Sequence, residues 1–174
     1  MSNALVALIV IGLMLVAALS LSNASFNWID STTQSWKEMV ETSESVSRTD
    51  IEVMSANTTA PYVEALVRNS GKVHIREFSN WDVLVQYYDG NSTYYINWLS
   101  HDSGTDPPDN QWAVATIYSD DSLAQQEVFE PGILNPGEVV LLRLRLVPQP
   151  GAGTTNLLAV SSPNGVYTSA QFQG

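Results

Sequence analysis

Residues 4–19 read ALVALIVIGLMLVAAL, a stretch without a single polar side chain. Extending it to Leu21 adds only one serine, and the first charged residue of the whole chain is Asp30. About 20 residues of α-helix, rising ~1.5 Å each, span the ~30 Å hydrocarbon core of a bilayer. A helix that is apolar around its whole circumference is buried in lipid or in other protein. The stretch therefore predicts a helix that needs a covering outside its own chain.

Three interpretations of this segment stay open from its own residues. A cleaved signal peptide would begin with basic residues, but Met1, Ser2 and Asn3 have no charged side chain. Ala18-Leu19-Ser20, with small residues at its first and third positions, could nevertheless pass as a cleavage site. The second interpretation is a permanent single-pass anchor. The third, which we favour, is a helix that waits in the membrane and then moves into the core of a polymer.

The next segment, residues 23–48, favours the third interpretation because it continues a helical pattern. Lys37 and Glu41 are four residues apart, as are Glu44 and Arg48, and such pairs support a helix. Apolar and small side chains recur at 3.6-residue spacing along one face. We expect one helix over about 3–48, roughly 70 Å long, that could kink at 22–25. Its second half is expected to pack a narrow face on the domain behind it, through Phe26, Ile29, Trp36 and Val40.

From about residue 51 the pattern changes to period two, which is typical of β-strands. Val140, Leu142, Leu144 and Leu146 make one apolar face, for example, while the intervening arginines lie on the other. Turn sequences such as Asp89-Gly90 and Asn164-Gly165 separate the runs and signal hairpins. We predict an immunoglobulin-like β-sandwich of seven or eight strands over 51–174 behind a helical domain at 1–48, an α+β chain. The expected strands include 63–67, 81–87, 94–98, 112–118, 140–146, 157–160 and 166–172.

Composition narrows the classes of function. Lys and Arg number 7 against 18 Asp and Glu, a net charge of −11, so no nucleic-acid partner is expected. Charged residues are only 14% of the chain, below the roughly 25% of ordinary soluble domains. The chain has no cysteine, which excludes disulfides, a thiol nucleophile and a cysteine-ligated metal.

No catalytic or cofactor motif is recognisable, so we expect neither an enzyme nor a bound cofactor. Ser100-His101-Asp102 resembles a triad in composition only, because neighbouring side chains in an extended backbone point apart. Carboxylates suit Ca²⁺, but the acidic loop residues lack an EF-hand pattern and are better explained as solvated turns, with no metal site expected. These residues are Asp102, Asp106, Asp109, Asp120 and Asp121.

Three turns of the second half form a recognisable series. Asn69-Ser70-Gly71 follows a strand, Asn135-Pro136-Gly137-Glu138 precedes one, and Pro163-Asn164-Gly165 introduces the last. In this order behind this helix, they resemble the turns of the archaellins, the subunits of the archaeal swimming filament. The architectural resemblance covers the whole chain. Bacterial type IV pilins differ in carrying Glu at the fifth mature position, where this sequence has Leu5 if Met1 is near the mature terminus. The basic leader that archaellin precursors carry is not visible in the sequence.

The resemblance implies a structural subunit of an extracellular archaellum-like, type IV pilus-like helical filament, for motility or adhesion. The chain's main partner would be itself, and the subunit would lie in the membrane before assembly. During biogenesis it would meet a class III signal peptidase and a membrane assembly platform. Close packing of the helix among many copies is expected to involve Ala4, Leu5, Leu8, Ile9, Gly12, Leu13, Val16 and Leu19.

Two further expectations accompany the resemblance. Archaellins are often glycosylated at Asn-X-Ser/Thr sites, and this chain has such sites at Asn91, at Asn57 and, less favourably placed beside the helix core, at Asn23. Archaellum stator proteins share the plan of one helix and a sandwich. A membrane-anchored β-sandwich binding module, or a stator component, is therefore the alternative to a filament subunit.

Overall fold

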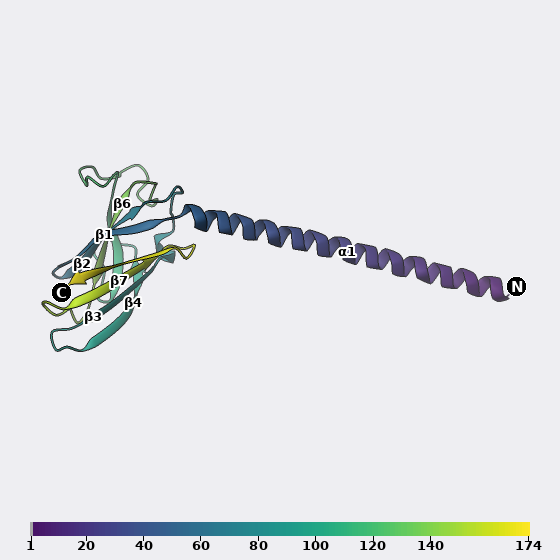
Figure 1. Ribbon diagram of the computed structural model, residues 1–174, viewed down its shortest axis with the longest axis horizontal. Helices are drawn as coiled ribbons and strands as arrows, with labels where there is room; N and C mark the ends of the chain where they lie inside the picture. Colours follow the sequence, from purple (N-terminus) through teal and green to yellow (C-terminus); the bar gives the residue numbers. More distant parts are fainter. Residues whose placement is uncertain (1) are drawn as a thin grey trace. The chain divides into compact units, whose positions relative to one another are not determined.

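The computed structural model describes residues 2–174, and it begins with one continuous helix, α1, over Ser2–Arg48 (Figure 1). The helix is not interrupted at 22–25, and within this stretch the Ser25 hydroxyl donates to the Leu21 carbonyl, 2.9 Å away. The chain divides into two compact units, of which the first ends at Ser43 and the second is Glu44–Gly174. The last turn of α1 therefore belongs to the second unit.

The second unit contains eight strands and one short 3-10 helix, η1. In sheet order the strands run β1-β2-β6-β5-β4-β3-β7-β8. Their bounds are β1 Ile51–Thr59, β2 Tyr62–Asn69, β3 Asp82–Tyr88, β4 Tyr94–Asp102, β5 Gln111–Tyr118, β6 Val139–Arg145, β7 Thr155–Ser161 and β8 Tyr167–Gln173, with η1 at Phe78–Asn80.

The strands form two layers that curl toward a barrel. One layer is β1-β2-β6-β5 and the other is β4-β3-β7-β8, with antiparallel neighbours inside each. A short parallel contact of Ser100–Asp102 with 111–113 joins the layers at one side. At the other side the Thr58 hydroxyl of β1 donates to the Gln173 carbonyl of β8 over 2.7 Å. The α+β prediction of a helix followed by a β-sandwich is confirmed, and Figure 1 shows the single long helix followed by the strands.

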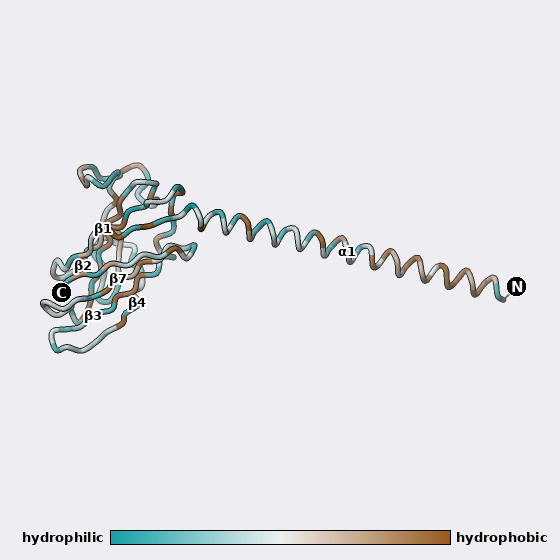
Figure 2. The backbone as a smooth tube through the Cα atoms, in the orientation of Figure 1, coloured by the Kyte–Doolittle hydropathy of each residue, from teal (hydrophilic) through white to brown (hydrophobic). Residues whose placement is uncertain are grey.

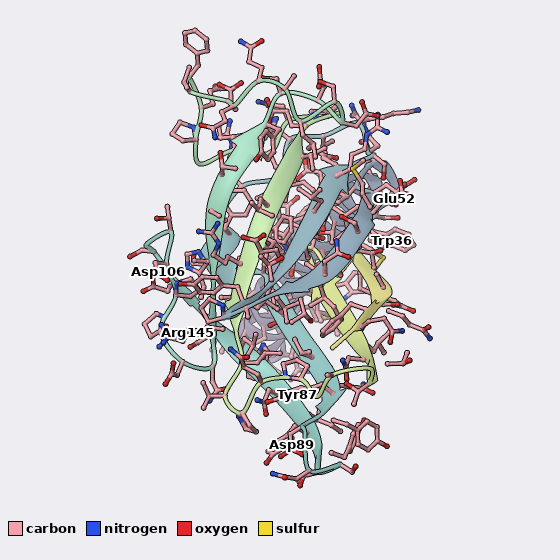
Figure 3. All side chains as sticks on the ribbon, turned by 90° about the vertical axis from the view of Figure 1, so that its left-hand side faces the viewer. Trp36, Glu52, Tyr87, Asp89, Asp106 and Arg145 are labelled. Atoms are coloured by element: carbon pink, nitrogen blue, oxygen red, sulfur yellow. The ribbon has the colours of Figure 1, made fainter. Side chains whose placement is uncertain are left out.

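The core lies between the two layers and follows the alternation expected from the sequence. In β6, Val140, Leu142 and Leu144 are fully buried, whereas the intervening Arg143 and Arg145 lie on the outer face. Trp112 and Tyr87 are the largest fully buried side chains, and Figure 3 labels Tyr87 on the sandwich. Burying an aliphatic side chain such as Leu142 stabilises the fold by about 1.5–3 kcal/mol.

Two features were not individually predicted. Strand β1 carries a bulge between Val53 and Ser55, which breaks the period-two signal. The second is the segment between β5 and β6, which reads as a loop but returns to the core: Leu134 is fully buried, and its backbone pairs with that of Ile75. Both hairpin signals are confirmed, since Asp89-Gly90 joins β3 to β4 and Asn164-Gly165 joins β7 to β8.

Candidate functional site

The first half of α1 is an uncovered apolar surface. From Leu5 to Leu21 its large side chains are between 43% and 75% exposed, and no acidic or basic residue interrupts them. Figure 2 shows this half of the helix in the hydrophobic colour and the following half as mixed. The helix is long and apolar enough to cross a membrane. Because exposing so much apolar surface to water is unfavourable, this segment needs lipid or other protein around it.

The residues predicted to make the polymer core all lie on this exposed helix, including Ala4, Leu8 and Leu13. Their contacts in an assembly stay a prediction. Gly12 is informative because a Cβ built on it would meet no atom within 4 Å. The single chain therefore gives no reason for a glycine there, and any constraint on its size would come from a neighbouring helix.

The second half of α1 presents the face expected to contact a domain. Phe26, Ile29, Trp36 and Val40 are 51–64% exposed in the chain alone, so their packing stays a prediction. The two expected ion pairs form, with Lys37 Nζ 3.9 Å from Glu41 and Arg48 Nη1 3.2 Å from Glu44. Both pairs are more than half exposed, and such pairs contribute only a few tenths of a kcal/mol.

The end of α1 is held to the sandwich by two of the turns that carry the resemblance. The Thr49 hydroxyl, in a residue only 6% exposed, donates to the Ser45 carbonyl over 2.9 Å and accepts a 2.6 Å hydrogen bond from the Asn164 amide. Asn164 belongs to the β7–β8 hairpin. A turn near the chain's end therefore fixes the residue that follows the helix, a role that the sequence did not reveal.

The turn at 69–71 also contacts the end of α1 and the residues that follow it. The Lys72 amide donates to the Arg48 carbonyl over 2.8 Å, and the Gly71 amide donates to the Asp50 carbonyl over 3.0 Å. A Cβ on Gly71 would stand 2.5 Å from the Asp50 nitrogen. Only glycine allows this close backbone approach, which explains why the turn has Gly at that position.

The third turn, at 135–137, is tied to the second through Asn69. Asn69 is fully buried, and its side-chain amide donates to the carbonyls of Val73 and Leu134 over 2.8 and 2.9 Å. Its backbone exchanges hydrogen bonds with Gly137 and Glu138. The three turns thus form one polar network at the helix end of the second unit. We call Thr49, Asn69, Gly71, Asn135, Glu138 and Asn164 the junction network.

The acidic loop residues are each engaged in turns or ion pairs. Asp102 accepts from the Gly104 amide, Asp106 contacts the Tyr62 hydroxyl, and Asp109 pairs with Arg145 at 2.8 Å. Figure 3 shows Asp106 and Arg145 at the same side of the sandwich. The remaining two are similar, since Asp120 accepts from Ser122 and Asp121 pairs with Arg68. Within residues 2–174, no three His, Asp or Glu side chains gather as metal ligands would.

His101 is half-buried with its ring edge against Trp112, the centroids 4.7 Å apart. Burial lowers the pKa of His101 below its usual value, and the neighbouring Asp102 carboxylate opposes that shift. The imidazole packs against an aromatic ring, and its position is that of a structural residue.

Two of the three glycosylation sequons lie on exposed parts of the sandwich. Asn91 is in the β3–β4 turn and Asn57 is on the outer side of β1, and both are exposed. Within residues 2–174 neither side-chain amide makes a hydrogen bond, so both are accessible to a modifying enzyme. Asn23 is exposed too but lies inside α1.

Comparisons with known proteins agree with this architecture. In fold, the chain is similar to the archaeal flagellum of Methanospirillum hungatei strain JF1, with a TM-score of 0.56, 16% identity, and coverage of 96% of this chain and 90% of that one. It is also similar to the archaellum periplasmic stator protein FlaG from Sulfolobus acidocaldarius, with a TM-score of 0.49, 22% identity, and coverage of 71% of this chain and 99% of that one.

A sequence relative and a family model complete the comparison. An uncharacterized protein of Archaeoglobus fulgidus is 28% identical over 145 residues, which cover 80% of this chain and 74% of the relative. The family model described as archaeal-type flagellin matches residues 2–172, nearly the entire chain. Flagellins are structural proteins and not enzymes. The chain belongs to the archaeal-type flagellin family.

Proposed function

We propose that this chain is the subunit of an extracellular helical filament of the archaellum kind. The observation that carries the proposal is the exposed apolar surface of α1 from Leu5 to Leu21, which needs a covering. Copies of the same helix can supply it, because Ala4, Gly12 and the other small residues permit close approach. Head-to-tail contacts that do not close into a ring generate such a filament.

The proposed path of the subunit combines this surface with what the family resemblance implies. Before assembly α1 lies in the membrane, where its length and hydropathy suit a bilayer span. A membrane assembly platform then transfers it into the filament, after a class III signal peptidase has processed the precursor. Filament formation removes α1 from lipid and places the sandwich outside, on the filament surface. Motility and adhesion both use this arrangement.

The alternative function is a membrane-anchored β-sandwich module, including a stator component of the archaellum. The same helix supports it, since a span that stays in lipid is covered equally well. The two functions differ in where the helix ends up, and this difference decides the experiment.

A charge placed in the apolar helix tests polymerisation through this segment. Leu13→Asp is expected to abolish filaments, because an unpaired carboxylate in the core of a helix bundle costs several kcal/mol in every subunit. Ser31→Asp is the matched control, since it adds the same charge at an exposed polar position beyond the apolar stretch. Filaments are counted by electron microscopy of sheared cell-surface material. Normal filaments from Leu13→Asp would refute polymerisation through this segment.

Glycosylation of the sandwich is a second, separable part of the proposal. Exposed Asn91 and Asn57 are the expected acceptors, and a filament surface would carry their glycans outward. Intact-mass spectrometry of the native protein is expected to exceed the polypeptide mass and to fall in steps in Asn91→Gln and Asn57→Gln. The bare polypeptide mass in the native protein would remove this part alone.

A further inference from the structure

Strand β4 has an unpaired backbone edge. Its antiparallel partner β3 covers one side along Tyr94–Leu99, whereas β5 covers the other side only from Ser100 onward. Among residues 2–174, no backbone group pairs with Tyr94, Ile96 or Trp98 on the side away from β3. An uncovered edge of this kind is a template for another strand.

The hydrogen-bond directions show which groups point to this edge. The Asp89 amide donates toward β4, to the Thr93 carbonyl, while the Tyr88 amide donates toward β7, to the Asn156 side chain. Because directions alternate along a strand, Tyr87, Val85 and Val83 bond to β4. Their partners there are Tyr95, Asn97 and Leu99. The amides and carbonyls of Tyr94, Ile96 and Trp98 therefore point outward from the sheet edge.

Other strand edges in the sandwich are covered in part. Near the end of β5 the returning segment pairs with it, and there the Glu127 amide donates to the Ile117 carbonyl over 2.8 Å. The outer edges of β1 and β8 meet at the Thr58–Gln173 hydrogen bond. The uncovered edge of β4 also carries exposed apolar side chains, since Ile96 is 58% and Trp98 74% exposed.

The outer face beside this edge carries little charge. In register across β4, β3, β7 and β8 its side chains are aromatic, aliphatic or neutral polar, apart from Asp82 at the start of β3, opposite Ser161. The opposite layer differs, because Arg143 pairs there with Glu64 at 2.9 Å. The neutral side chains are Tyr94, Ile96, Trp98, Leu84, Gln86, Tyr88, Leu157, Ala159, Ser161, Tyr167, Ser169 and Gln171.

We propose that two copies of this chain pair through β4, antiparallel and about a two-fold axis at Ile96. The edge is self-complementary, because the three outward-pointing residues are centred on Ile96. Each Ile96 would exchange both backbone hydrogen bonds with its copy, and Tyr94 would oppose Trp98 of the other copy. Aromatic cross-strand pairs of this kind are favourable. Every outward amide and carbonyl between Tyr94 and Trp98 gains a partner in this register.

Charge identifies a second copy as the occupant. The chain carries a net charge of −11, so two copies repel each other wherever acidic surfaces meet, and the neutral face is where they approach at least cost. This contact is two-fold, whereas assembly through α1 is head-to-tail. The β4 contact therefore joins sandwiches of separate filaments or of separate membrane-anchored copies, and it does not depend on the function proposed for α1.

Single cysteines test the pairing because the chain has none of its own. Opposed residues in a hydrogen-bonded antiparallel pair have Cα atoms about 5.5 Å apart, within the range that a disulfide bridges. With the full chain in detergent micelles under mild oxidation, Ile96→Cys is expected to give severalfold more covalent dimer than Ser169→Cys. Ser169 is the matched control, exposed on β8 of the same face.

Two additional experiments test the register of the β4 pairing and its contribution to dimerisation. A mixture of Tyr94→Cys and Trp98→Cys chains is expected to cross-link more than either variant alone. Ile96→Lys is expected to remove the dimer contribution from sedimentation of the full chain, because it places two ammonium groups on the axis. If Ile96→Cys gives no more dimer than Ser169→Cys, the pairing is overturned, whatever happens to filaments. If Tyr94→Cys or Trp98→Cys alone cross-links best, the Ile96-centred register is wrong.

Discussion

The side-chain amide of Asn164 donates a 2.6 Å hydrogen bond to the hydroxyl of Thr49, a residue 115 positions earlier in the sequence. Thr49 directly follows α1, and Asn164 lies in the turn before the last strand. The contact therefore joins the first and the last elements of the second unit. The turn at 163–165, one of those that resemble archaellin turns, therefore holds the residue that follows α1 against the sandwich.

Asn164→Ala is expected to lower the free energy of unfolding of the sandwich by about 1–2 kcal/mol, because the buried Thr49 hydroxyl loses its donor. Thermal unfolding of the full chain in detergent micelles, followed by tryptophan fluorescence, measures this change. Asn57→Ala is the matched control, since its exposed side chain makes no hydrogen bond within residues 2–174. Equal midpoints for the two variants would show that the contact contributes nothing to stability.

Gly71→Ala is expected to destabilise the sandwich by about 1–3 kcal/mol, because overpacking forces the backbone to shift. The added Cβ would stand 2.5 Å from the Asp50 nitrogen and 2.8 Å from the Arg48 carbonyl oxygen. Gly90→Ala makes the same chemical change in the β3–β4 turn, where a Cβ meets nothing within 4 Å. Denaturant unfolding should separate the two variants, and identical curves would contradict the close approach.

Leu134→Ala is expected to cost about 2–5 kcal/mol, the usual range for removing a buried leucine. Leu134 is fully buried although it lies in the long segment between β5 and β6. Phe129, in the same segment, is 88% exposed, so Phe129→Ala is expected to change stability by less than about 0.5 kcal/mol. Chemical denaturation of both variants checks whether this segment is part of the core. A small effect of Leu134→Ala would show that it is not.

His101 gives the sandwich a pH dependence of known sign. Burial holds the pKa of His101 below its unfolded value of about 6.5, so the unfolded chain binds more protons between the two values. The contribution of His101 to the free energy of unfolding is fully present above about pH 6.5. It is lost as the pH falls through the pKa of His101 in the folded chain. His101→Gln is expected to flatten this part of the profile of unfolding midpoint against pH. An unchanged slope in the variant would contradict the lowered pKa.

The fold could be predicted largely because its periodicities are clean. Sixteen-residue runs such as 4–19 leave no alternative to a helix, and Val140, Leu142 and Leu144 alternate without error in β6. Strand β1 was not resolved as a strand because its bulge at Val53–Ser55 shifts the alternation partway along. Leu134 lies outside any strand, so its burial could not be predicted from a periodic pattern.

The candidate sites were predictable only where one segment carries them. The apolar half of α1 is contiguous, and the sequence alone identifies it. The junction network joins residues from 49 to 164. The sequence therefore shows that each turn exists, but it does not show that the turns contact one another. The free edge of β4 depends on β5 covering only its end, a fact of sheet order that no local pattern encodes.

The central claim is that α1 builds a filament, and the most direct measurement is electron microscopy of filaments sheared from cells, with N-terminal sequencing of the main protein band. The account predicts thin filaments whose main band yields this chain, beginning at or near its apolar segment. If the protein instead stays with the membrane and no filament contains it, the filament function is contradicted and a membrane-anchored module becomes the better explanation.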